Sequence, residues 1–159
     1  MSYARQENAQ LRQIAPDIYN AVLALSQLAG KAGLDKKLLE LVKIRASQIN
    51  GCAFCVQYHI LHAEKLGLPA DKLNLVVVWR EAPLFSKRER AALAWTEALT
   101  QLGSGVSDEV YAEATAEFSE KELVYLTSAV SVINVWNRYG VAYRWTPPVR
   151  PNAVNAAAS

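Results

Sequence analysis

The spacing of apolar residues constrains the fold of this chain more than any other feature. Over most of its 159 residues, apolar side chains recur every three or four positions, the period that places them on one face of a helix. One run, Leu75–Trp79, instead has the β-branched composition that favours strands. A single strand would have no partner for its backbone hydrogen bonds, so we expect this run to be helical as well. The sequence therefore predicts an all-α fold.

Start and stop signals divide the chain into about six to seven helices. Ser86 and Ser119 are each followed three residues later by a glutamate, and this capping box is typical of a helix start. Gly67 marks a helix end. The predicted helices cover residues 15–29, 35–50, 52–66, 70–80, 87–101 and 120–138, with a shorter one after Ser107.

The length of the chain suits one domain with a hydrophobic core of its own. We expect a single compact domain over residues 1–148 and a disordered tail over residues 149–159, where Pro, Ala and Asn dominate. Apolar residues make up 52% of the chain, and the segment Leu123–Trp136 is apolar on nearly all sides. One small subunit would not hide so much apolar surface, so we expect an oligomer.

Charge and apolar content exclude several classes of partner. Lys and Arg number 17 against 15 acidic residues, and no basic run is long enough to follow a phosphate backbone, so we expect no nucleic-acid partner. Residues 1–13 are polar and do not resemble a signal peptide, and no run approaches the roughly 18 apolar residues of a membrane span. We therefore expect a cytoplasmic protein without a membrane partner, in a reducing compartment where a cysteine pair is more plausibly catalytic than structural.

Both cysteines of the chain, and one of its two histidines, lie within the eight residues from Cys52 to His59. If Cys52 opens a helix, then Cys52, Cys55 and His59 follow the i, i+3, i+7 spacing of one helix face. The Cα atoms of the two cysteines would lie about 5 Å apart, within the range that a disulfide needs. The spacing predicts a thiol pair that cycles between dithiol and disulfide beside an imidazole that can take a thiol proton.

Spacing alone leaves open which thiol is the nucleophile. His59 is one helical turn from Cys55, which favours Cys55, whereas the amide dipoles at a helix start would lower the pKa of Cys52. Two buried and inert cysteines are the structural alternative.

Zinc binding is a competing interpretation, because Cys52, Cys55, His59 and His62 supply four ligand types. On one continuous helix, however, Cys52 and His62 would be about 15 Å apart, and four zinc ligands must all lie within about 2.3 Å of one ion. We therefore expect no metal site, and we place His62 at the surface or in side-chain packing.

The spacing of four residues matches a known family. Glu40 stands twelve residues before Cys52, and His59 stands four residues after Cys55. This stretch resembles the AhpD-like alkylhydroperoxidases of the carboxymuconolactone decarboxylase superfamily, and the similarity covers roughly residues 15–148. Three further segments look like this family: residues 79–80, 89–99 and 134–138.

The resemblance implies a role for each residue of the pattern. Cys55 would be the peroxidatic thiol, which attacks a hydroperoxide, and Cys52 the resolving thiol. His59 would be the base, and Glu40 would orient it or relay its proton. The resemblance also implies an all-helical subunit in a homotrimer or homohexamer, re-reduced by a dithiol reductant or carrier protein, with no metal, flavin or nucleotide cofactor. One departure from the family is Phe54, where better-studied members have a second histidine.

Other interpretations of these residues remain open at this point. Glu40 has Lys36 and Lys43 at helical spacing, so it could belong to an exposed charge ladder. Ser47 lies on the same face as Glu40 and is either a weak site candidate or a serine bonded to its own helix. For the whole chain, the rival functions are a lactone decarboxylase, which does not need a CxxC pair, and a redox-sensing or scaffolding oligomer without turnover.

The chain also contains a faint internal repeat. Five residues within 37–50 recur at the same spacing within 121–134, as a duplicated helical unit would produce. The second copy has Trp136 where the first has Cys52, so one copy alone can carry thiol chemistry.

Overall fold

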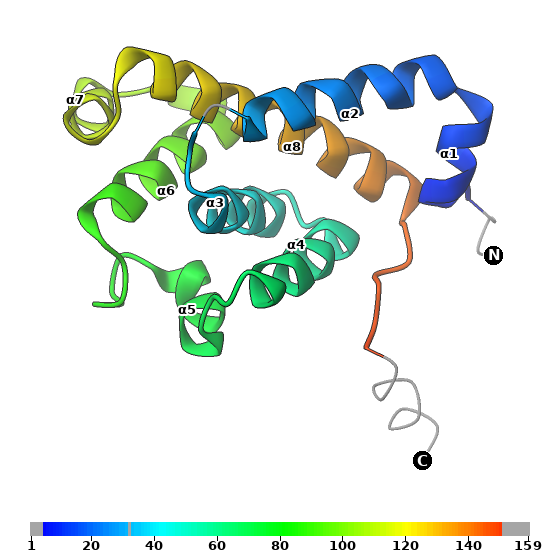
Figure 1. Cartoon of the computed structure of the whole chain (residues 1–159), viewed down its shortest axis with the longest axis horizontal. Helices are drawn as coiled ribbons and strands as arrows, with labels where there is room; N and C mark the ends of the chain where they lie inside the picture. The colour runs from blue at the N-terminus through cyan, green and yellow to red at the C-terminus, as the bar shows by residue number, and fades with distance from the viewer. Residues whose placement is uncertain (1–4, 32, 151–159) are drawn as a thin grey trace.

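Helices make up all the regular structure of the residues that the structure, a computed structural model, describes, namely 5–31 and 33–150 (Figure 1). Within them lie eight α-helices: α1 (Asn8–Ile14), α2 (Pro16–Gly30), α3 (Lys36–Ile49), α4 (Ala53–Lys65), α5 (Ala70–Leu75), α6 (Lys87–Thr100), α7 (Asp108–Glu117) and α8 (Glu120–Tyr143). Two short 3₁₀ helices, η1 (Val76–Val78) and η2 (Leu102–Ser104), lie between them. The all-α prediction is confirmed, and the strand-like run forms the end of α5 and η1.

The count of six to seven helices is too low because the sequence analysis missed α1. This helix has the unusual N-cap Glu7, which forms a capping box with Gln10. The Glu7 carboxylate also accepts hydrogen bonds from the backbone and side chain of Thr146, at 3.1 and 2.7 Å. Arg5 donates to the carbonyl oxygen of Ala142 at 2.7 Å. Contacts with the far end of the chain therefore fix α1, and local sequence signals do not show them.

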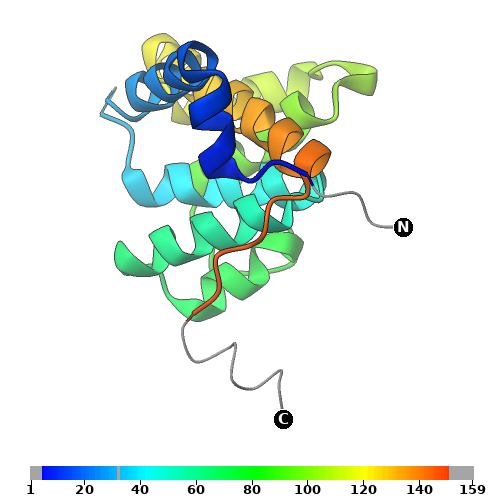
Figure 2. The ribbon, with the colours of Figure 1, turned by 90° about the vertical axis from the view of Figure 1, so that its right-hand side faces the viewer.

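Helix α3 occupies the centre of the fold and packs against α4, α6 and α8 (Figure 1). Its buried apolar residues face two ways: Leu38 and Leu39 belong to one buried cluster with α6 and α8, while Leu41 and Ile44 belong to a second with α4, α5 and α6. Figure 2 shows α3 and α4 side by side. A helix buried on opposite faces cannot shift without opening both clusters, so α3 is a rigid base for the residues it carries.

A buried carboxylate, Glu97 on α6, ties three segments together. It accepts hydrogen bonds from Arg45 Nε at 2.7 Å and from Trp79 Nε1 at 2.8 Å, and it also pairs with Arg80. Burial raises the pKa of Glu97, but these donors outweigh burial and hold it below its usual value. Two of the family-like segments, 79–80 and 89–99, thus meet at one ion-pair cluster.

Helix α8 packs against α2, α3, α4, α6 and α7, while Val124 and Val141 on its outer side are exposed. It continues to Tyr143, beyond the predicted end at residue 138, and ends at Arg144 in a left-handed conformation. Part of the exposed apolar surface lies on α1 and α2. Five large side chains there are 36 to 68% exposed: Ile14, Ile18, Leu23, Leu25 and Leu28.

Equivalent residues of the internal repeat meet across α3 and α8. Asn50 Nδ2 donates to Asn134 Oδ1 at 2.9 Å, and the same amide reaches Asn137 Oδ1 at 2.9 Å. Asn137 Nδ2 in turn donates to Ser47 Oγ at 2.9 Å. This polar network joins the end of α3 to the middle of α8, next to the cysteine pair.

None of the described helices is both long enough and apolar enough to cross a membrane. Of the tail predicted to be disordered, residues 151–159 lie outside the described residues. Arg150 pairs with Glu64 on α4, so the described part of the tail lies beside that helix.

Candidate active site

A glycine turn folds α4 back along α3. Gly51 has a φ of 67°, a backbone conformation that glycine adopts without steric cost. Because α4 packs along α3 after this turn, Glu40 on α3 lies next to His59 on α4. The structure thereby brings together all four residues that the sequence singled out.

The two cysteines lie at the start of α4. Cys52 is the N-cap, and its sulfur accepts a hydrogen bond from the backbone N–H of Cys55 at 3.3 Å. The two residues form a disulfide with their Cα atoms 5.3 Å apart, close to the predicted separation. Both side chains are buried, at 1% and 3% exposure. The helix start and the reach of the two thiols are thus as predicted.

Glu40 is a buried carboxylate with two partners. Its Oε2 lies 2.7 Å from Nδ1 of His59, and its Oε1 accepts a hydrogen bond from Lys43 Nζ at 2.8 Å. Burial alone would raise the pKa of Glu40, but His59 and Lys43 together lower it to about 2. The residue is 6% exposed, so it does not belong to an exposed charge ladder, although Lys43 does pair with it.

His59 is held in a form that can accept a proton. Burial lowers its pKa more than the neighbouring Glu40 raises it, so the imidazole is neutral near pH 7. Because ionised Glu40 can only accept a hydrogen bond, Nδ1 must carry the hydrogen. The lone pair then lies on Nε2, and His59 can act as a general base.

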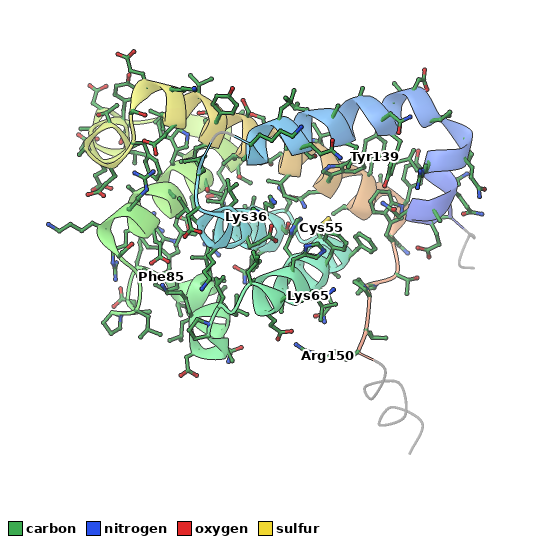
Figure 3. All side chains as sticks on the ribbon, in the orientation of Figure 1. Lys36, Cys55, Lys65, Phe85, Tyr139 and Arg150 are labelled. Atoms are coloured by element: carbon green, nitrogen blue, oxygen red, sulfur yellow. A yellow bond between two sulfur atoms is a disulfide. The ribbon has the colours of Figure 1, made fainter. Side chains whose placement is uncertain are left out.

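A cavity of about 260 Å³ leads to this pair, with walls from α2, α3, α4 and α8. Cys55 and His59 both line it, and most of its surface is apolar. Figure 3 shows Cys55 where α4 approaches α8. Five aromatic side chains contribute to the walls: Tyr19, Phe54, Tyr58, Trp136 and Trp145. An apolar molecule that enters this cavity would reach Cys55 with little water around it.

The backbone of α8 lies directly against the disulfide at Gly140. A Cβ atom at this position would lie 2.5 Å from Cys52 Sγ and 3.3 Å from Cys55 Sγ, so only glycine allows this approach. Gly140 was not among the predicted site residues, although a lone glycine inside an apolar helix is a signal for close packing. Behind it, the carbonyl oxygen of Ser47 accepts the backbone N–H of Cys52 at 3.0 Å. Ser47 thus has a positioning contact as well as the predicted bond to its own helix, from Oγ to the Lys43 carbonyl at 2.7 Å.

His62 lies at the rim of the cavity and is exposed, as expected. Its ring stacks on Tyr58, with centroids 4.5 Å apart. Among the described residues, no three His, Cys, Asp or Glu side chains are close enough together to hold a metal ion.

A family model described as the carboxymuconolactone decarboxylase family matches residues 16–98 of the chain. The chain belongs to this family. The uncharacterized protein YdfG of Bacillus subtilis (strain 168) is 33% identical over 131 residues, which span 82% of this chain and 89% of YdfG.

Solved structures share the fold of this family member. A protein of unknown function from Agrobacterium tumefaciens, named as a candidate AhpD antioxidant defence protein, superposes with a TM-score of 0.86. It is 37% identical, and the match covers 92% of this chain and 99% of that one. The debrominase Bmp8 shares the fold at 19% identity, with a TM-score of 0.79 over 89% of this chain and 76% of its own. The AhpD-like resemblance drawn from residues 40–59 is confirmed.

Phe54 gives this AhpD-like site an apolar wall where better-studied relatives have a histidine. Its ring stacks on Tyr58 at 5.9 Å and meets Trp145 edge-on at 5.3 Å. Within the described residues that line the cavity, His59 is the imidazole hydrogen-bonded to a carboxylate, and His62 lies out at the rim. Among these lining residues, His59 is therefore the candidate for proton transfer near the sulfurs.

We expect Gly140→Ala to displace the cysteine pair. The new methyl group would overlap Cys52 Sγ, and relief of such overpacking typically costs about 1 to 3 kcal/mol. The free energy of unfolding should fall by this amount, and disulfide formation in a dithiol redox buffer should become less favourable. Gly103→Ala is the matched control, since a Cβ there meets no atom within 4 Å. Equal effects of the two substitutions would contradict the close packing at Gly140.

We expect Glu40→Gln to weaken the pH dependence of the unfolding free energy in the acid range. The folded-state pKa of about 2 lies below the ordinary value of 4.5, so the ionised carboxylate stabilises the fold above pH 4.5 and loses this effect as the pH falls. Between pH 4.5 and pH 3 the wild type should lose about 2 kcal/mol more unfolding free energy than Glu40→Gln in urea titrations. The exposed control Glu81→Gln should follow the wild type; a parallel loss in Glu40→Gln would disprove the pairing.

Proposed function

We propose that this protein is a thiol-dependent peroxidase that reduces hydroperoxides through a dithiol/disulfide cycle of Cys52 and Cys55. The single observation that carries the proposal is that Cys55 lines an apolar cavity together with a neutral, carboxylate-bound His59, while its disulfide partner Cys52 lies behind it. Membership of the carboxymuconolactone decarboxylase family and the similarity to AhpD-like proteins support it.

In the first step, His59 Nε2 accepts the thiol proton of Cys55, and the resulting thiolate attacks the terminal oxygen of the hydroperoxide ROOH. An S–O bond forms and the O–O bond breaks. The leaving alkoxide takes the proton back from His59 and departs as the alcohol ROH. Cys55 becomes a sulfenic acid, Cys–SOH. Glu40 supports this step by holding Nδ1 protonated and by stabilising the imidazolium that forms briefly.

In the second step, the Cys52 thiolate attacks the sulfur of the sulfenic acid, and hydroxide leaves as water with the proton from the Cys52 thiol. The product is the disulfide seen in the structure. A dithiol reductant or carrier protein then returns the pair to the dithiol by two exchange reactions. The complete cycle converts ROOH and one external dithiol into ROH, water and one external disulfide, with no metal, flavin or nucleotide.

The two sulfurs differ in their access to the cavity and in their electrostatic surroundings, and these differences suggest a role for each. Cys55 lines the cavity, whereas Cys52 is 1% exposed and has its sulfur against the backbone at Gly140. The N–H of Cys55 and the helix start stabilise a Cys52 thiolate, which suits a resolving thiol that must attack a neighbouring sulfur. We therefore assign Cys55 as peroxidatic and Cys52 as resolving, in agreement with the family pattern.

Neither rival function would need both the thiol pair and the cavity beside it. Lactone decarboxylation needs no vicinal thiols, and a redox sensor needs no substrate cavity beside its disulfide. Lactone turnover that survives thiol alkylation would support the first rival, and reversible oxidation without peroxide turnover would support the second.

We expect the two cysteine variants to behave differently. Cys55→Ser should lose all reaction with tert-butyl hydroperoxide, because the nucleophile that lines the cavity is gone. Cys52→Ser should react once and then stop, since no second thiol is present to resolve the sulfenic acid. Dimedone labelling followed by mass spectrometry of the peptide spanning residues 46–65 should locate the adduct on Cys55. An adduct on Cys52 in the Cys55→Ser protein would reverse the assignment, and no adduct in either variant would favour the sensing function.

We further propose that the protein is a cytoplasmic homo-oligomer, a trimer or hexamer as in AhpD-like relatives. The exposed apolar side chains of α1 and α2 provide a surface that a second subunit would cover. Light scattering should give a multiple of the 17.5 kDa subunit mass.

The double substitution Leu25→Glu, Leu28→Glu should dissociate the oligomer, because it places charges on this apolar face. Val124→Glu is the control, since Val124 is 64% exposed on a different helix. A monomeric wild type at micromolar concentration, or an oligomer that withstands both glutamates, would remove α2 from the interface.

A further inference from the structure

A basic cleft adjoins the mouth of the active-site cavity. It lies between the first turn of α3 and the last turn of α4, and four of its lining residues carry a basic side chain: Lys36, Lys43, His62 and Lys65. Glu40, Lys43 and His62 line both the cleft and the cavity, so the two spaces are continuous. Figure 3 labels Lys36 and Lys65 on their two helices.

Some charged side chains of the cleft have a partner of opposite charge, and others do not. Glu40 is its acidic residue, and that carboxylate is already bound to Lys43 at 2.8 Å and to His59 at 2.7 Å. Among the described residues, no carboxylate lies within ion-pair distance of Lys36 or Lys65. The cleft therefore presents two unneutralised ammonium groups at the entrance to an apolar cavity, an arrangement that attracts an anion.

The spacing along α4 gives the length of a matching ligand. Cys55 and His62 are seven residues apart, and Cys55 and Lys65 are ten apart, which correspond to about 10 and 15 Å along the helix axis. A molecule whose apolar body fills the aromatic cavity would reach the lysines with an anionic group about 10 to 15 Å from its reacting atom. Carboxylates of chain-like apolar molecules have this form.

We propose that the cavity and the cleft form one site for amphipathic carboxylates, and that the preferred substrates are hydroperoxides of fatty-acid type. The apolar chain lies against the aromatic walls, the hydroperoxide reaches Cys55, and the carboxylate lies between Lys36 and Lys65. This inference rests on the proposed peroxidase function for its substrate, but the binding site itself does not require turnover. Lys36 and Lys65 act on specificity and take no part in the chemistry.

Binding of an unreactive probe tests the site without any peroxidase chemistry. Decanoate and decan-1-ol differ only in the charged group, and quenching of tryptophan fluorescence can report both, since Trp136 and Trp145 line the cavity. On the oxidised protein, decanoate should bind about tenfold more tightly, and added salt should reduce the difference, because exposed ion pairs are screened.

The double substitution Lys36→Gln, Lys65→Gln should abolish this preference and leave decan-1-ol binding unchanged. The matched control is Lys87→Gln, Lys121→Gln, which removes the same charge from exposed positions elsewhere. Equal binding of the two probes to the wild type would overturn the proposal, as would an equal loss of decanoate binding in both double variants.

Kinetics on the reduced protein link the site to its substrate. A fatty-acid hydroperoxide should react with a KM about tenfold below that of its methyl ester, and the Lys36/Lys65 variant should raise the KM of the acid alone. Consumption of tert-butyl hydroperoxide should stay unchanged in that variant. If the wild type binds decanoate but consumes no hydroperoxide, the peroxidase function fails and the carboxylate site stands. If the variant loses only its reduction by an acidic dithiol carrier protein, the cleft is a protein docking site and the proposal is wrong.

Discussion

The hydrogen bond between Glu40 and His59 is the interaction on which the candidate site depends. A carboxylate that is 6% exposed is costly to bury without partners, and here the partners come from two helices, Lys43 on α3 and His59 on α4. Because α4 returns along α3 after Gly51, it brings His59 to the buried Glu40 carboxylate and so gives this charge a second partner. The pair in turn fixes the tautomer and orientation of His59, and so places Nε2 near the cavity where Cys55 lies.

The second requirement is the close approach of α8. The amides of Asn50, Asn134 and Asn137 join α3 to α8, and this contact lies three residues before Gly140, where the helix backbone reaches the sulfurs. The asparagine network and Gly140 act together. The amide hydrogen bonds hold α8 in one rotation about its axis, and the absence of a side chain at Gly140 lets its backbone contact the sulfurs. Equivalent asparagines of the internal repeat supply one of these bonds, so the faint sequence repeat coincides with a real junction in the fold.

Local sequence signals predicted most helices and the geometry of the cysteine pair, because capping boxes and i, i+3 spacing act within a few residues. They failed for α1, whose cap Glu7 is stabilised by Thr146 at the other end of the chain. They also left Glu40 ambiguous between a charge ladder and a site residue, since its burial depends on α4. Gly140 and the aromatic cavity were not predicted at all, because both arise where helices distant in sequence come together.

Phe54 makes the surroundings of the cysteine pair apolar. A histidine at that position would bring a second titratable group next to the sulfurs, whereas the phenyl ring extends the aromatic wall formed with Tyr58 and Trp145. The Phe54 ring itself can neither donate nor accept a proton. In the proposed mechanism, proton transfer then passes through one imidazole, whose pKa burial already lowers. An apolar reactant that fills the cavity would exclude more water, so the proposed hydroperoxide substrates and the proposed base His59 suit this site for the same physical reason.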